Sequence, residues 1–162
     1  PGLDVEALTD TVLKSAEVRA GFLVGERQFG TLQFHAYSTA EVRAGAEAAL
    51  SAMGKKREDA ERPKIMASKI VTRVDDQHAF LMNRNKTGSM VLGGESIYLL
   101  ECQPAAYAIL ACNEAEKEAD IKVIDMRMIG ANGRLYLAGT EADVRNARDA
   151  AERALREAGA TG

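Results

Sequence analysis

Side chains that commonly perform catalysis or bind metals are scarce in this sequence and lie far apart. The two histidines, His35 and His78, form neither an H-x-x-x-H nor an H-E-x-x-H motif, and neither has an obvious nucleophile partner. The two cysteines, Cys102 and Cys112, lack the paired spacing of zinc ligands, and we interpret them as buried free thiols. Because no acid–base or nucleophile set converges, the sequence argues against an enzyme and predicts no metal.

Two glycine-containing stretches do not qualify as nucleotide-binding loops. Residues 84–89 (RNKTGS) lack the G-x-x-x-x-G-K-[ST] pattern of a phosphate loop. Residues 130–133 (GANG) form only G-x-x-G, which is too short for a dinucleotide fingerprint. We therefore expect no cofactor.

A charged pair in a predicted turn is the remaining candidate. Glu26 and Arg27 lie between Gly25 and Gly30, and glycines give a loop the backbone freedom to change conformation. The chemistry available to such a pair is a reversible ion pair. From the residues alone, a solvated turn with no further role is the more ordinary interpretation.

Composition and charge exclude several classes of protein. The 162 residues are 46% hydrophobic and 28% charged, with 21 basic and 24 acidic side chains and a net charge of −3. This balance is typical of a globular protein and lacks the basic surface expected of a nucleic-acid-binding protein. No segment approaches the roughly 20 apolar residues of a membrane span, and no signal peptide is visible, so we expect a cytoplasmic protein.

An internal repeat organises the chain. Residues 1–30 align without gaps on residues 104–133, and the order of predicted elements repeats with them. Identities in this register include Pro1/Pro104, Lys14/Lys117, Ala16/Ala119, Gly30/Gly133 and, just beyond the aligned segment, Leu32/Leu135.

The second copy has the clearer pattern. A strand is predicted at 96–102, a helix from Pro104 through Ala119, and a hairpin whose strands are 121–128 and 134–138. Strict alternation predicts Val123, Asp125 and Arg127 on one face of the first hairpin strand. Thr140 is the predicted N-cap of a last helix that ends near Gly159.

The first copy shows the same order but lacks a strand before Pro1. It has a helix at 3–16, hairpin strands at 21–25 and 31–37, and a helix capped by Thr39 that runs through Met53. A charged linker follows at 54–63, then a strand at 64–73 and a short helix at 75–86. The predicted fold is α+β, with antiparallel sheets and helices packed on one face, and the predicted domains are 1–63 and 64–162.

Several segments together resemble a known family. Residues 98–117 (YLLECQPAAYAILACNEAEK) and 129–144 (IGANGRLYLAGTEADV), with ERQFG at 26–30 and HAFLMNRNKTGSM at 78–90, are similar to tandem-domain shell proteins of bacterial microcompartments, of the gated-pore carboxysome subgroup. The resemblance implies two bacterial microcompartment (BMC) domains of ferredoxin-like type. It also implies a trimer that forms a pseudohexagonal tile in the shell, with a gated central pore.

The resemblance also assigns roles to particular residues. The pore-facing loop of the first repeat would be Gly25, Glu26, Arg27, Gln28, Phe29 and Gly30, with Glu26 and Arg27 as the gate. The pore-facing loop of the second repeat would be Ile129, Gly130, Ala131, Asn132 and Gly133. Lys14 and Lys117 would lie at the tile edge, and residues 75–86 would make interdomain or trimer contacts.

The implied partners are other shell proteins, a second trimer stacked face to face, and small anionic metabolites such as phosphorylated sugars or bicarbonate. One departure is that relatives carry a strand before the position of Pro1. The competing hypothesis is a ferredoxin-like regulatory protein that binds a small molecule at subunit interfaces. A trimer with a central hole would favour the tile, whereas a dimer with a tightly bound ligand would favour the regulator.

Overall fold

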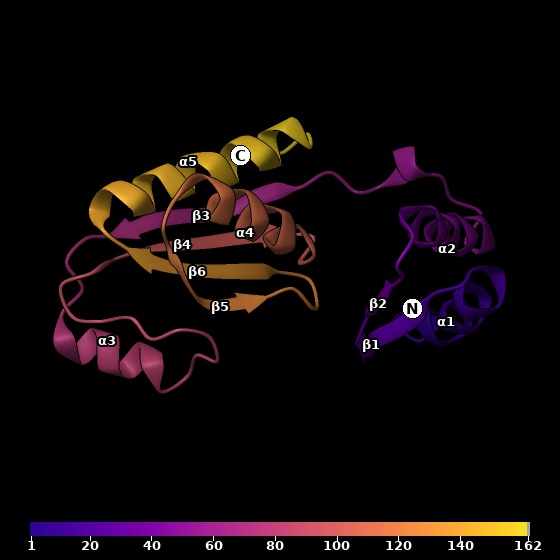
Figure 1. The fold of residues 1–162 in the computed structure, drawn as a ribbon, viewed down its shortest axis with the longest axis horizontal. Helices are drawn as coiled ribbons and strands as arrows, with labels where there is room; N and C mark the ends of the chain where they lie inside the picture. Colours follow the sequence, from indigo (N-terminus) through magenta and orange to yellow (C-terminus); the bar gives the residue numbers. More distant parts are fainter. Residues whose placement is uncertain (162) are drawn as a thin grey trace. The chain divides into compact units, whose positions relative to one another are not determined.

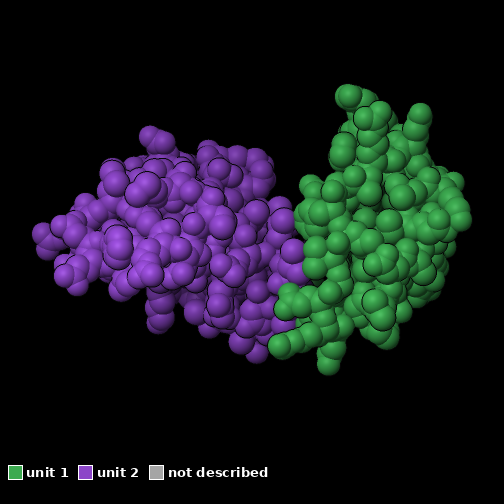
Figure 2. All heavy atoms as spheres, turned by 90° about the horizontal axis from the view of Figure 1, so that it is seen from below, with its two compact units in different colours: residues 1–61 green, residues 62–162 purple. Residues whose placement is uncertain are grey.

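The computed structural model describes residues 1–161 and divides the chain into two compact units. The first unit is Pro1–Glu61, and the second begins at Arg62; Figure 2 colours them green and purple. Each unit is described by itself.

The first unit is a two-stranded antiparallel hairpin with two helices. In chain order it consists of α1 (Asp4–Ser15), β1 (Arg19–Glu26), β2 (Phe29–His35) and α2 (Thr39–Ala52), followed by a short 3-10 helix, η1 (Arg57–Asp59). Val5 and Val12 of α1 are buried, and Gly45 of α2 lets Phe34 and Val12 approach its backbone. Because a Cβ at Gly45 would lie 3.1 Å from the Phe34 ring, the glycine sets the closeness of this packing.

The second unit is built on a four-stranded antiparallel sheet (Figure 1). Its strands follow the spatial order β3-β4-β6-β5, so the buried strand β4 pairs with β3 on one side and β6 on the other. The elements are β3 (Lys64–Val71), α3 (Asp76–Asn83), β4 (Ser96–Gln103), α4 (Tyr107–Glu118), β5 (Lys122–Arg127), β6 (Gly133–Gly139) and α5 (Glu141–Glu157). These elements confirm the predicted α+β class.

Alternate side chains of β4 and β6 point to opposite faces of the sheet, and each face has its own apolar cluster. Tyr98 and Leu100 of β4, with Leu135 and Leu137 of β6, pack against α4 and α5 in the larger cluster. The smaller cluster lies on the opposite face, where Ile97 of β4 meets buried residues of α3 and of the chain that follows it. Both faces of β4 are therefore buried.

The structure confirms the repeated order of elements. Helix α1 begins at Asp4 and ends at Ser15, and the gap-free alignment pairs these residues with Tyr107 and Glu118, the first and last residues of α4. A hairpin and a second helix follow in both repeats. The repeat inferred from few identities is thus a repeat of structure.

Two predicted helix starts were wrong. The side chain that caps α2 belongs to Ser38, whose Oγ accepts from the Ala40 N–H at 3.2 Å, whereas Thr39 is the first helical residue. Helix α4 begins at Tyr107 and not at Pro104, because the intervening residues form a tight turn in which Tyr107 N donates to the Pro104 carbonyl. The Thr140 cap was predicted correctly, since its Oγ1 accepts from Asp143 N.

The predicted alternation along β5 was also wrong. The pairing register shifts between Val123 and Asp125, so that Val123 faces the helices with Met126, whereas Asp125 faces the opposite side. There Asp125 is only 5% exposed, and its carboxylate lies 3.5 Å from Lys86 Nζ and 3.1 Å from Arg127 Nε. The shift therefore buries a carboxylate that simple alternation does not place inside.

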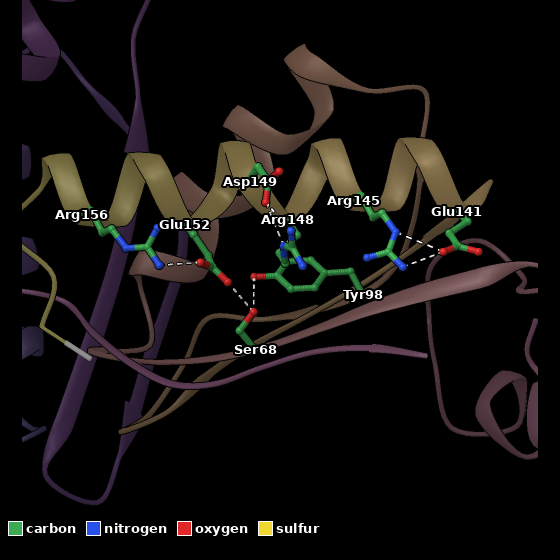
Figure 3. Close-up of polar contacts among 8 residues, drawn as sticks. All are labelled: Ser68, Tyr98, Glu141, Arg145, Arg148, Asp149, Glu152 and Arg156. Carbon is green, nitrogen blue, oxygen red and sulfur yellow. Dashed lines mark hydrogen bonds and ion pairs between the residues drawn. The ribbon is translucent and has the colours of Figure 1, made fainter. Parts of the chain in front are cut away.

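A polar network fastens α5 to the sheet (Figure 3). The Ser68 hydroxyl donates to Glu152 Oε1 at 2.5 Å and lies 3.4 Å from the fully buried Tyr98 hydroxyl. Glu152 also accepts from Arg156 at 2.6 Å, one helical turn away. Burial raises the pKa of Tyr98 well above its usual range, so its hydroxyl remains protonated. One carboxylate thus joins helix α5 to strand β3.

We expect Glu152→Ala to destabilise the second unit by about 1–2 kcal/mol, because the half-buried Ser68 hydroxyl loses its carboxylate acceptor and α5 loses its hydrogen bond to β3. Urea denaturation followed by tyrosine fluorescence measures the change. Glu157→Ala, at the exposed end of the same helix, is the control and should change stability by less than about 0.5 kcal/mol. Equal effects of the two substitutions would show that the network contributes nothing.

The capping assignment makes a separate prediction. Ser38→Ala should cost about 1 kcal/mol because the Ala40 N–H loses its acceptor, while Thr39→Ala should be close to neutral. Circular dichroism during urea unfolding measures both variants. A larger loss for Thr39→Ala than for Ser38→Ala would contradict the assignment.

Candidate functional site

The described residues contain no cluster of three or more His, Cys, Asp or Glu side chains that could hold a metal ion. His35 lines a surface hollow beside Glu41, but that carboxylate accepts the backbone N–H of Glu17 at 2.8 Å. His78 is exposed on α3. Among the helices of residues 1–161, none is both long and apolar enough to cross a membrane.

Both cysteines are free and buried, as predicted. Burial raises the pKa of the Cys102 thiol to about 11, and burial together with the nearby Glu116 carboxylate does the same for Cys112. Since the thiolate is the reactive form, neither residue is an activated nucleophile at neutral pH.

The two hairpin tips are the features that the sequence singled out, and in the structure they occupy equivalent positions in the two repeats. The first tip connects β1 to β2, which pair from Arg19↔His35 to Glu26↔Phe29. Glu26, Arg27, Gln28 and Phe29 are all exposed. Within residues 1–161 the Glu26 and Arg27 side chains form no ion pair, so both charges are available to other molecules.

Arg27 has an uncommon backbone conformation. Its φ angle is +53°, in the left-handed region that L-residues with side chains seldom adopt. The residue at the equivalent position of the second repeat is Gly130, with a φ angle of +95°. The turn geometry therefore suits glycine. An arginine at this position raises the conformational energy of the folded backbone by about 1 kcal/mol.

The same close contact supports both tips. A Cβ at Gly133 would lie 2.4 Å from the Ala105 carbonyl oxygen, and a Cβ at Gly30 would lie 2.7 Å from the Gly2 carbonyl oxygen. Gly2 and Ala105 are themselves equivalent residues, just before α1 and α4. Each hairpin thus passes directly against the backbone that begins the preceding helix, and only glycine permits that approach.

The second tip is held by side chains. Asn132 Nδ2 donates to Glu101 Oε1 at 2.6 Å, and Asn132 Oδ1 accepts from Gln103 Nε2 at 2.6 Å. The hydrogen bond from Asn132 lowers the pKa of Glu101, and the Arg134 guanidinium, 3.4 Å away, acts in the same direction. The sequence analysis had included Asn132 in the loop but missed both of its partners on β4.

The two repeat-related lysines lie at the ends of equivalent helices. Lys14 Nζ contacts Asp10 at 2.6 Å on α1, and Lys117 Nζ contacts Glu114 at 2.7 Å on α4. Both lysines are largely exposed. They are accessible to a neighbouring molecule, although each is paired within its own helix.

The buried Asp125 is another residue that the sequence analysis had not predicted. Its neighbours Lys86 and Thr87 lie in the segment between α3 and β4, and Lys86 Nζ is 3.4 Å from the centre of the Tyr136 ring. The contacts fix that segment to the sheet. They could be anticipated only from the register shift in β5, for which the sequence pattern carries no signal.

Two family models match the chain. Residues 1–59 match the model described as the CsoS1D N-terminal domain, and residues 96–161 match the BMC domain. Among curated relatives, carboxysome shell protein CcmP of Synechococcus elongatus is 45% identical over 89% of this chain and 68% of its own length. Carboxysome shell protein CsoS1D of Hydrogenovibrio crunogenus is 38% identical over 96% of this chain and 77% of its own length.

Two solved structures share the fold at high similarity. A fused permuted hexameric shell protein from the RMM microcompartment has 62% identity and a TM-score of 0.92, covering 98% of this chain and 80% of its own. A double-ringed trimeric shell protein from the same type of compartment has 41% identity and a TM-score of 0.94, covering 99% and 80%.

The chain spans 61% of the length of a third curated relative, the CsoS1D shell protein of Prochlorococcus marinus, to which it is 40% identical. The relatives cover both repeats and are named as structural components of shells. The chain therefore belongs to the tandem-domain family of bacterial microcompartment shell proteins that includes CcmP and CsoS1D, and its role is structural and not enzymatic.

Proposed function

We propose that this protein forms a trimeric, pseudohexagonal tile of a microcompartment shell, in which the two kinds of hairpin tip surround a gated pore. The observation that carries the proposal is the structural equivalence of the two tips. A chain with two equivalent repeats, taken three times around an axis, presents six hairpins of alternating type. The domains assigned to 1–63 and 64–162 would be the two repeats.

The gate of this pore would be Glu26 and Arg27. Threefold symmetry brings three copies of each side chain near one axis, where like charges repel unless each glutamate meets an arginine. Exposed ion pairs contribute only about 0–1 kcal/mol each, so a pore closed by such pairs can reopen. When the pairs separate, the arginines favour anions in the opening.

The left-handed backbone of Arg27 supports this assignment. Glycine would fit the turn without strain, as Gly130 does in the second repeat, yet the first repeat carries a charged side chain there. Strained backbone of this kind is found most often at ligand-binding and switch regions of proteins. The strain and the charge are thus located at the same residue.

The wider assembly follows from the same model. Lys14 and Lys117 would meet neighbouring tiles at the edge, and α3 with the segment that follows would make contacts within the trimer. Two trimers would stack face to face, other shell proteins would surround the tile, and small anionic metabolites such as phosphorylated sugars or bicarbonate would pass through it. The compartment would be a carboxysome or a catabolic relative.

Native mass spectrometry tests the assembly. We expect trimers and paired trimers, because three chains complete the ring. A stable dimer that retains a stoichiometric small molecule would contradict the tile and favour the regulatory protein instead.

Substitution of the arginine tests the gate. In reconstituted shells that enclose a reporter enzyme, Arg27→Gly and Arg27→Ala should each change the entry rate of an anionic substrate by severalfold, because both remove the charge. Arg27→Gly should also raise the unfolding free energy by roughly 0.5–1 kcal/mol, since it relieves the left-handed strain.

Arg73 provides the matched control, because it has a φ angle of +48° in the turn after β3. Arg73→Gly should increase stability in the same way and leave the entry rate unchanged. If both Arg27 variants left the rate and the pore conformations unaltered, the gate assignment would be wrong.

A further inference from the structure

Equivalent hairpin tips in this chain are held by different forces. Asn132 in the second tip aligns with Phe29 in the first. Asparagine has two donor hydrogens and one acceptor oxygen, whereas phenylalanine has no polar atom. The second tip therefore has a hydrogen-bonding amide at this position. The first tip has an apolar ring there, and that ring is 37% exposed.

The Asn132 side chain forms hydrogen bonds with two residues of the buried strand β4. Glu101 and Gln103 are alternate residues of β4, so their side chains leave the same face of the sheet. The single amide of Asn132 bridges them, with both heavy-atom distances at 2.6 Å. Strand β4 is paired on both sides and packed on both faces, which makes it a rigid anchor.

The bridge is strong for a pair of side-chain contacts. One of its two hydrogen bonds ends on a carboxylate, and such charge-assisted bonds are roughly twice as strong as neutral ones. Glu101 is 28% exposed and Asn132 is half-buried, which limits competition from water. Glycine at position 130 adopts the turn conformation without strain, so the local backbone does not oppose the bridge.

The first tip has the opposite character. Residues 26–29 are exposed, Arg27 is strained, and no side-chain hydrogen bond of Glu26, Arg27 or Gln28 occurs within residues 1–161. Its support comes from backbone groups, through the strand pairing that ends at Glu26↔Phe29 and the close contact between Gly2 and Gly30. No side chain therefore ties the first tip to the rest of the described residues in the way that Asn132 ties the second.

We propose that Asn132 is a positioning residue that locks the second hairpin tip to β4, so that opening and closing of the pore are movements of the first tip alone. The functional half of this inference rests on the proposed pore. In a trimer, three locked tips would fix part of the pore wall, and the largest aperture would be set by how far the three movable tips withdraw.

Amide hydrogen exchange of the full chain in its assembled state tests the lock. We expect Asn132→Ala to raise the exchange rate of peptides covering 129–133 by about tenfold, with peptides covering 25–30 unchanged. Gln103→Ala removes one of the two hydrogen bonds without altering the tip itself and should raise the same rate by about threefold. Asn146→Ala, on the exposed face of α5, is the control and should change neither.

Exchange at 129–133 within about twofold of the parent protein in both variants would overturn the lock. If Asn132→Ala also raised exchange throughout α4 and α5, the substitution would have destabilised the whole unit. The Gln103→Ala variant would then test the lock, and exchange at 129–133 within about twofold of the parent protein would overturn it. Native mass spectrometry of the same samples separates the two proposals. Absence of trimers would refute the pore, while the exchange rates would still confirm or refute the lock.

Discussion

Each repeat of this shell protein depends on one close backbone contact between a hairpin and the start of the helix that precedes it. At Gly30 and at Gly133 the hairpin comes so near to residues 2 and 105 that no Cβ could be accommodated. In the first repeat the contact is reciprocal, because a Cβ at Gly2 would lie 2.8 Å from the Arg27 carbonyl oxygen and 2.7 Å from that of Phe29. This contact fixes where each hairpin emerges from its helices.

The contact places the two tips in equivalent positions, but the tips differ in how firmly their side chains hold them. The second tip adds an amide bridge to a buried strand and has glycine at the left-handed position. The first tip has an arginine at that position, with an exposed acidic neighbour. In the proposed pore, the second repeat would therefore form a static wall and the first would respond to its surroundings, although both repeats have one fold. Duplication within a chain permits this division, because the two copies can vary independently, whereas identical subunits cannot.

The sequence predicted those features that depend on local pattern. Proline, glycine and the alanine-rich helices gave the order of elements, and the alignment of Pro1 with Pro104 paired the ends of α1 and α4 correctly. Ser38 was missed because serine and threonine stand side by side and either can cap a helix. The register shift in β5 was missed because hydrophobic alternation cannot reveal an extra residue in one strand.

The site was predicted less completely than the fold. Family resemblance identified Glu26, Arg27 and Asn132 as loop residues, but neither the left-handed backbone of Arg27 nor the partners of Asn132 follow from the sequence. Those partners lie on β4, about 30 residues earlier in the chain, and strand pairing alone brings them beside the tip. Side-chain contacts across a sheet depend on register, which no local pattern specifies.

The central claim is that both hairpin tips of every chain face a common threefold axis. An electron cryo-microscopy map of the purified protein tests it most directly. The account predicts a ring of three chains with a central opening bordered alternately by Glu26–Phe29 and Ile129–Asn132. A map that shows single chains, or places these residues away from the axis, would contradict it.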